Sequence, residues 1–250
     1  MPEYHLTKFL SDIINERGIV TTKVNPLILY YYLLNSRNSD NKREQFRLFK
    51  DIAIEGLDSF RNRQKKIIDQ LANCNPPFSH KLIRASLKKV AVSGLGISSG
   101  FETGICMHFI YGFPYFTASS LKGIASDYAI FFEDKKEESK EYIAVFGNQQ
   151  QEGKVIFFDA LPENESDIFD VGVMTPHHQK YYSGEAWPGD YFSPTPIPFL
   201  TIKKGVKFVI PIVSRDNDAF KNAKRWLEGA LKKIGAGAKT SVGYGVFKVE

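Results

Sequence analysis

The chain of 250 residues lacks most features that mark secreted, membrane-spanning or metal-dependent proteins. It has only two cysteines, Cys74 and Cys106, which lie far apart and match no spacing of a zinc site or a disulfide framework. Its N-terminal MPEYHLTKFL has no basic flank followed by an apolar core, and no apolar run approaches the roughly 20 residues that span a bilayer. We therefore expect a soluble, cytoplasmic protein with no membrane partner, metal or other cofactor.

Charge and aromatic content favour a polyanionic partner only moderately. The formal net charge is +5, and the chain contains 20 Phe and 12 Tyr. A basic balance of this size suits nucleic acid, and the aromatic side chains could either fill a core or stack on bases. Composition alone therefore leaves the partner open.

Residues 1–80 are expected to form a helical N-terminal extension. Apolar residues recur at helical spacing between Leu6 and Ile14, and Pro26 begins a second helical segment that reaches Leu34. A longer amphipathic helix is predicted from about 41 to 72. Two prolines at 76 and 77 end this pattern, which places a boundary near residue 80.

From residue 81 onward the pattern is mixed. Strands are predicted at 90–97, 105–111, 155–160, 206–213 and 242–249, helices at 121–132 and 216–234, and a solvated loop or helix end at 133–141. Residues 163–198, rich in Pro, Gly and Tyr, are expected to form a long loop inserted between the second and third strands. Apart from the short 105–111 strand, the order is that of the ferredoxin-like unit, which RRM-like modules share and whose open sheet faces RNA. The predicted fold class is α+β, with one such domain over 81–250.

A glycine-rich segment at 235–245 is the most distinctive local motif. Its four glycines allow backbone amides to converge on phosphate oxygens, and Lys239, Thr240 and Ser241 add a cation and two hydroxyl donors. A helix C-cap followed by a tight turn is the alternative interpretation. A Walker phosphate loop is excluded, because Ala238 stands where that motif needs glycine and a strand rather than a helix is expected to follow.

A second segment, 111–123, places two hydroxyls and a lysine at the start of a predicted helix. Ser119 and Ser120 are expected to act as N-caps, and Lys122 follows them one turn later. The helix dipole and free amides at such a position favour an anion. Plain helix capping is the alternative.

Together the two segments resemble the RAMP superfamily of CRISPR proteins, and within it the family of the sixth subunit of the type III-B Cmr effector complex. The likeness rests on Gly112-Phe113-Pro114-Tyr115 before the serine-lysine helix start and on the C-terminal string from Gly237 to Gly245. It covers roughly residue 92 to the C-terminus. One departure is Thr117-Ala118, where the family often has proline-glycine.

The resemblance implies a non-catalytic RNA-binding subunit. Such a protein would hold the CRISPR guide RNA near its 3′ end, together with the guide-target duplex, between the repeating backbone subunit and the first subunit of the complex. The residues expected to contact RNA are Ser119, Ser120, Lys122, Gly235, Gly237, Lys239, Thr240, Ser241, Gly243 and Tyr244. Of these, Tyr244 is expected either to stack on a base or to pack internally.

A catalytic alternative also follows from the sequence. His177 and His178 lie in the long loop near Tyr181 and Tyr182, residue types that could serve a metal-independent ribonuclease of the kind known among RAMP relatives. Adjacent histidines point in different directions in a regular backbone, so we expect loop structure or a subunit contact instead. His108, on a predicted strand, is expected to be structural.

Overall fold

The computed structural model of the chain describes residues 25–35, 46–50, 52–97, 103–175, 184, 187 and 196–250. The predicted helix near residues 6–14 and the residues His177, His178, Tyr181 and Tyr182 lie outside these ranges. None of the helices in the described ranges is long and apolar enough to cross a membrane. The fold is α+β, with antiparallel sheets and helices.

The main sheet has β1 (Ser79–Leu87) and β6 (Lys207–Ser214) at its centre. These strands pair antiparallel from Ser79 opposite Ser214 to Ser86 opposite Lys207. Two short strands, β2 (Val155–Phe157) and β3 (Leu161–Pro162), both pair with β6, and β7 (Phe247–Val249) pairs with the other side of β1. Across the sheet, the strands therefore lie in the order β2-β6-β1-β7.

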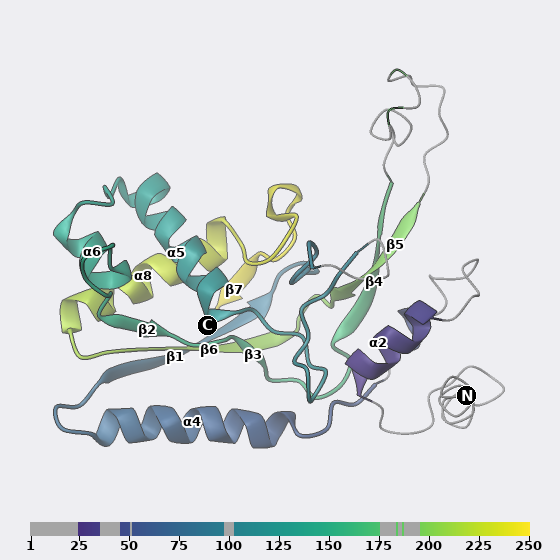
Figure 1. The fold of residues 1–250 in the computed structure, drawn as a ribbon, viewed down its shortest axis with the longest axis horizontal. Coiled ribbons are helices and arrows are strands. Elements are labelled where there is room, and N and C mark those ends of the chain that lie inside the picture. Colours follow the sequence, from purple (N-terminus) through teal and green to yellow (C-terminus); the bar gives the residue numbers. More distant parts are fainter. Residues whose placement is uncertain are drawn as a thin grey trace.

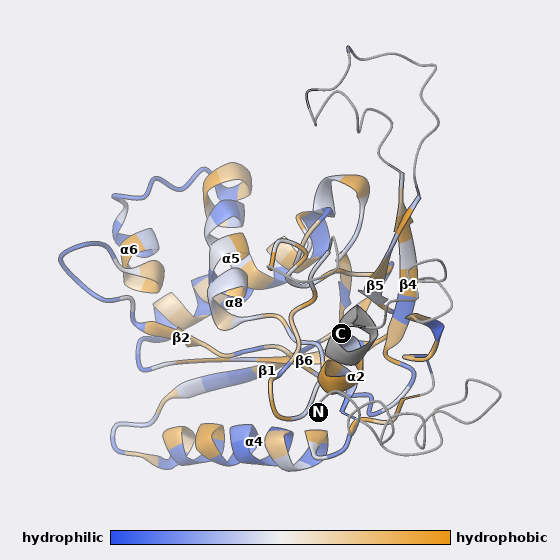
Figure 2. Ribbon diagram, turned by 45° about the vertical axis from the view of Figure 1, so that its right-hand side comes forward, coloured by the Kyte–Doolittle hydropathy of each residue, from blue (hydrophilic) through white to orange (hydrophobic). Residues whose placement is uncertain are grey.

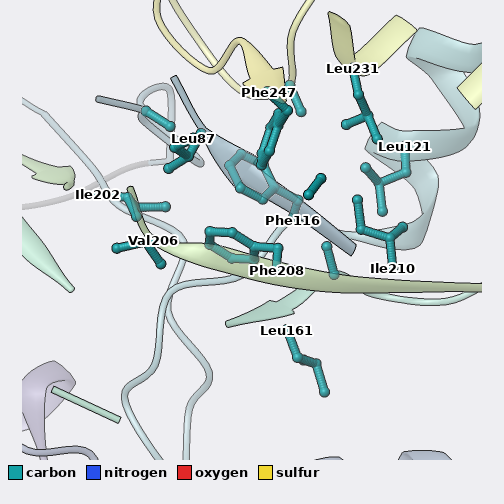
Figure 3. Packing of buried hydrophobic residues seen from close by; sticks show 14 of the residues in the cluster. Leu87, Phe116, Leu121, Leu161, Ile202, Val206, Phe208, Ile210, Leu231 and Phe247 are labelled. Carbon is teal, nitrogen blue, oxygen red and sulfur yellow. The ribbon is translucent and has the colours of Figure 1, made fainter. Parts of the chain in front are cut away.

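One face of this sheet carries the core because strand side chains alternate between faces. Ile83 and Leu87 of β1 and Phe208 and Ile210 of β6 are buried on this face. Helices α5 (Ala118–Glu133), α6 (Lys140–Phe146) and α8 (Asn217–Lys233) cover it. Figure 3 shows Leu121 of α5 and Leu231 of α8 above these strands, with Phe116 between Phe208 and Phe247.

The predicted helices at 121–132 and 216–234 are confirmed within a few residues. Asp216 caps α8 by accepting hydrogen bonds from the amides of Asp218 and Ala219, as the acidic start of this helix suggested. The segment expected as a solvated loop at 133–141 is partly wrong, since α6 begins at Lys140 with Ser139 as its N-cap.

The opposite face of the sheet is covered by α4 (Leu57–Asn73), which runs beneath β1 and β6 in Figure 1. Hydrophilic and apolar residues alternate along this helix (Figure 2), and only Leu57 and Ile68 are buried. Arg61 fastens α4 to the sheet by donating to the backbone carbonyls of Pro162 and Glu163. This sheet face therefore differs from the open, RNA-facing sheet of RRM-like modules, because a helix covers it.

The single helix predicted at 41–72 is wrong as well. Gly56 has a left-handed backbone (φ 80°) and stands at the N-cap of α4. Ile52 and Ile54 before it are buried in the common core in a non-helical segment. The apolar spacing that predicted one helix therefore comes from two separate pieces, while the segment predicted from Pro26 is confirmed as α2 (Pro26–Asn35).

The region expected as a loop at 163–198 contains regular structure at both ends. β4 (Phe169–Met174) and β5 (Ile197–Ile202) pair antiparallel, from Phe169 opposite Ile202 to Met174 opposite Ile197. This two-stranded ribbon projects away from the main sheet beside α2 (Figures 1 and 2). Cross-strand pairing between residues 169 and 202 overrides the turn-rich composition from which the loop was predicted.

Three predicted strands are also displaced. The first strand lies at 79–87 rather than 90–97, where only Ala91 forms a bridge, to Ile202. The 105–111 segment makes a single bridge, between Met107 and Pro114, and then turns. The closing strand is confined to 247–249, since 240–242 forms a 3-10 turn. Glycines or turns interrupt each of these three predicted strands, so the hydrogen-bonded strands begin or end at other residues.

Candidate functional site

The glycine-rich loop begins where α8 ends. The Gly235 amide donates to the carbonyl of Ala230, which caps the helix as the alternative interpretation anticipated. The loop is then fastened to the segment after β1, because the Ala238 amide donates to the Val92 carbonyl (2.7 Å) and the Gly245 amide to the Val90 carbonyl (3.0 Å). Gly235 is therefore structural, and the two backbone bonds hold the loop against the sheet edge.

Gly237 is required by this close approach. A Cβ on Gly237 would lie 2.2 Å from the Val92 carbonyl oxygen, and its φ is +94°. No other residue fits a backbone contact this tight without displacement. Gly237 thus allows the loop to lie directly against the backbone of residues 90–93.

Beyond this attachment, three successive amides are left without a hydrogen-bond partner in the described part of the chain. Among the residues that the structure describes, none accepts a hydrogen bond from the N–H groups of Lys239, Thr240 and Ser241. Lys239 has a left-handed backbone (φ 59°), and the 3-10 turn η2 (Thr240–Val242) follows it. Successive amides in such a turn form a concave cluster of donors suited to an anion. By contrast, the Gly243 and Tyr244 amides bond within the loop, to Thr240 and Lys239.

Side chains around the turn add positive charge. The Lys239 ammonium lies 5.8 Å from the centre of the Phe199 ring in β5, within the range of a cation–π contact. Tyr244 packs on the same ring at 6.3 Å, so it is an internal packing residue as well as a partly exposed one. The Lys89 Nζ lies 2.9 Å from where a Cβ on Gly243 would stand, which brings a second lysine to the loop.

The start of α5 differs from the expectation. Thr117, not Ser119 or Ser120, is the N-cap, and its hydroxyl accepts from the Ser120 amide. The Asp159 carboxylate accepts from the Ala118 amide at 2.7 Å, so an anion of the chain itself already lies at this helix start. The prediction of Ser119 and Ser120 as N-caps is wrong, because the helix begins at Ala118 and Thr117 holds the N-cap position.

The two segments nevertheless lie side by side. The ring of Phe116, just before α5, is 3.2 Å from the Cβ position of Gly237, and it packs on Phe247, just after the loop, at 5.6 Å. The 88–93 segment between them contributes Ser93, whose hydroxyl donates to the Tyr115 carbonyl. One surface therefore combines the loop, the 88–93 segment and the start of α5. Lys122 is partly exposed on α5 and forms no ion pair with any residue in the described ranges.

Several residues of this surface were not singled out from the sequence as contacts: Lys89, Val90, Val92, Asp159 and Phe199. Lys89 carried no local signal, since it comes to the loop only through the pairing of the sheet.

His108 is a structural residue. His108 Nδ1 accepts from the amides of Ile110 (3.2 Å) and Tyr111 (3.4 Å), and burial among aromatic rings lowers the pKa of the imidazole. Burial also raises the pKa of the neighbouring Tyr115 to about 12. Both groups therefore stay neutral near pH 7, and the structural prediction for His108 is confirmed.

The chain belongs to the RAMP superfamily, whose model matches residues 90–248. It is 32% identical over 215 residues to the CRISPR system Cmr subunit Cmr6 of Pyrococcus furiosus, covering 62% of this chain and 63% of that protein. It is also 32% identical over 237 residues to the Cmr6 subunit of Saccharolobus solfataricus, covering 90% of this chain and 80% of that protein. The chain thus spans less than two thirds of the length of the Pyrococcus relative.

A solved structure has a similar fold over almost the whole chain. A chain of the type III-B Cmr-beta complex bound to cognate target RNA superposes with a TM-score of 0.68 at 25% identity, covering 98% of this chain and 87% of that chain. The family resemblance drawn from the two motifs is therefore confirmed.

Proposed function

We propose that this chain is a non-catalytic, RNA-binding subunit of a type III-B CRISPR effector complex, acting in the cytoplasm in antiviral defence. Its role is to hold the guide RNA near its 3′ end, with the guide-target duplex, between the backbone subunit and the first subunit. The Cmr6 relatives and the similarity to a chain of an RNA-bound Cmr complex support this proposal. The proposal includes a ferredoxin-like core, formed by β1, β2, β6 and β7 with α5 and α8.

The observation that carries the RNA-binding role is the turn at 239–241. Its three amides have no hydrogen-bond partner in the described part of the chain, and two lysines belong to the same loop region: Lys239 in the turn itself and Lys89, whose Nζ lies next to Gly243. A phosphate group needs both, and contacts of this type bind the backbone of RNA without reading its sequence. The amides account for the role of Thr240 and Ser241. Ser119, Ser120 and Lys122 belong to the proposed RNA-binding set because α5 starts just after Phe116, whose ring contacts the loop at Gly237.

The test is a salt titration of single-stranded RNA binding with matched lysine variants. Lys239→Ala and Lys239→Gly both remove the cation, but only glycine relieves the left-handed backbone at this position. Both variants should weaken binding by roughly a factor of ten and reduce the slope of log affinity against log salt by about 0.7, the value for one phosphate of a single strand. Lys66→Ala, an exposed lysine on α4, is the control.

Equal binding by all four proteins would contradict the proposal. So would an affinity that does not depend on salt, since phosphate contacts release counterions. The non-catalytic part is tested separately by incubating the protein with CRISPR repeat RNA without metal, where we expect intact RNA.

A further inference from the structure

A groove with a volume of about 460 Å³ runs along α8, on the side that faces α5. Five cationic side chains of α8 line it: Lys221, Lys224, Arg225, Lys232 and Lys233. Lys221, Lys224, Arg225 and Lys232 follow helical spacing along the exposed side of α8, and Lys233 lies toward α5, where it contacts Tyr128 and Phe132. The opposite side is the buried one, with Trp226 and Leu227 packed in the core. The stripe from residue 221 to 233 is about 18 Å long at the rise of an α-helix.

The floor of the groove is built by a glycine and an aromatic ring. Tyr128 of α5 lies across Gly229, where a Cβ would come within 2.2 Å of the ring. Phe132 stacks on Tyr128 at 5.0 Å. Glycine inside a helix is less favourable than alanine, and here it allows α5 and α8 to approach.

The aromatic floor holds one of the cations in place. The Lys233 ammonium lies 4.8 Å from the centre of the Phe132 ring and 5.6 Å from that of Tyr128. A lysine held by two rings loses less side-chain freedom when it binds an anion than a lysine free in solvent. The groove therefore contains a cation, the Lys233 ammonium, whose position is fixed by contacts with two aromatic rings.

Carboxylates neutralise only part of the stripe. Lys221 pairs with Asp218, Lys224 with Glu228, and Arg225 with Glu133. Within the part of the chain that the structure describes, Lys232 and Lys233 form no ion pair. Both lie in the last turn of α8, where the helix dipole also favours cations. The unpaired positive charge is thus concentrated at the C-terminal end of the groove.

This end of the groove leads directly into the glycine-rich loop. α8 ends at Lys233, Gly235 caps it, and the loop with Lys239 follows, as Figure 1 shows at the yellow end of the chain. Lysine is depleted in protein–protein interfaces, whereas it is a principal contact of nucleic-acid phosphates. Phe132, which stacks on Tyr128 and contacts the Lys233 ammonium, keeps 49% of its surface accessible and offers a face for a base.

We infer that the α5–α8 groove is a second phosphate-binding stretch, which carries the RNA strand onward from the glycine-rich loop along α8. This inference rests on the proposed function, because the strand in the groove is the one held by the loop. Lys232 and Lys233 contact consecutive phosphates, and the sequence of the RNA is not read. The groove thereby extends the footprint of the subunit on RNA beyond the two family motifs.

The experiment measures binding of a short fluorescent oligouridine to the full chain over a series of salt concentrations. The double variant Lys232→Ala/Lys233→Ala should reduce the salt slope by about 1.4, twice the value for one phosphate of a single strand. Lys65→Ala/Lys66→Ala removes two adjacent lysines from α4, on the other face of the sheet, and should leave the slope within error of the wild type. Lys232→Arg/Lys233→Arg keeps the charge and should keep the slope, which separates lost contacts from a weakened end of α8.

The outcomes separate this inference from the proposed function. If Lys239→Ala reduces the slope while the Lys232/Lys233 alanine variant matches its α4 control, the groove is not on the RNA path and the inference fails alone. A reduced slope in the groove variant with no effect of Lys239→Ala would support the groove and overturn the loop. If the groove variant binds RNA normally but no longer enters the assembled complex, the groove contacts protein and the inference is wrong.

Discussion

At the scale of single residues, Lys239 combines a functional side chain with an unfavourable backbone. Its φ of 59° is left-handed, which costs a residue with a Cβ about 1–2 kcal/mol. We predict that Lys239→Gly is more stable than Lys239→Ala by about 1 kcal/mol, since glycine avoids this cost. Urea unfolding of the two variants measures the difference. Equal stability would mean that the left-handed backbone at 239 is relaxed in solution.

The glycines of the loop should differ in how well they tolerate alanine. A Cβ on Gly237 meets a backbone oxygen at 2.2 Å, whereas a Cβ on Gly243 meets the end of the flexible Lys89 side chain at 2.9 Å. Gly243→Ala should therefore cost about 1–2 kcal/mol from its backbone alone, and Gly237→Ala about 3 kcal/mol or more. Thermal melts of both variants test this order, and the reverse order would contradict the attachment of the loop to Val92.

The sequence predicted the loop but not its surroundings. Four glycines, a lysine and two hydroxyl residues in eleven positions are a local signal, so Lys239, Thr240 and Ser241 could be found without a structure. Lys89, Val92 and Phe199 could not, because they reach the loop through strand pairing between distant segments. The serine N-caps were predicted wrongly since the Asp159 carboxylate, which lies more than forty positions along the chain from Ala118, shares the capping of α5 with Thr117.

At the scale of elements, the start of α8 should make stability depend on acid pH. The backbone N–H of Ala219, followed by Lys154, stabilises the charged form of Asp216 and lowers its pKa. As the pH falls, this carboxyl takes up a proton in the unfolded state, where its pKa is about 3.9, before it does so in the folded state. The stabilisation is therefore present above a pH of about 3.9. It is lost as the pH falls through the lower pKa of the folded state.

We expect Asp216→Ala to lose about 1 kcal/mol of unfolding free energy at pH 7, the usual contribution of an N-cap. The deficit relative to wild type should shrink as the pH falls below about 4. Urea titrations at pH 7 and pH 3 measure it. Asp218→Ala is the control, because its carboxylate is 92% exposed and 3.7 Å from Lys221, and it should change stability little at either pH.

The ring of Phe199 connects the β4–β5 ribbon to the loop. Gly172 of β4 leaves room for Phe199, since a Cβ there would lie 2.7 Å from the end of that ring, and the ring in turn contacts Lys239 and Tyr244. Phe199 is therefore a positioning residue for the Lys239 ammonium. The apolar alternation of the ribbon strands could have been predicted locally, but this contact depends on their register.

Phe199→Leu should weaken RNA binding toward the level of Lys239→Ala, because leucine offers no ring face to hold the ammonium. The matched control is Phe169→Leu, at the other strand of the ribbon, whose ring packs on Phe49 at 5.6 Å and not on Lys239. Both changes should cost a similar amount of stability, roughly 1–2 kcal/mol. If both lower the RNA affinity equally, Phe199 contributes only to packing.

At the scale of the whole molecule, the fold leaves the loop surface, and not the sheet face, for a partner. α4 covers the face that RRM-like modules use, and the helices α5, α6 and α8 cover the other. The α+β class and the order of the main helices and strands could be predicted from periodicity. The covering by α4 could not, since only Leu57 and Ile68 of that helix are buried and its charged sequence is that of a solvated helix.

The two backbone bonds that fasten the loop also make it observable. The amide hydrogens of Ala238 and Gly245 exchange with solvent only when their bonds to Val92 and Val90 open. These two amides therefore report the opening of the loop directly, without any label. A ligand held by the turn between them slows their exchange by the free energy of its binding, about 2.7 kcal/mol at a hundred times its dissociation constant. Deuterium uptake at two backbone positions thus measures occupancy of the site.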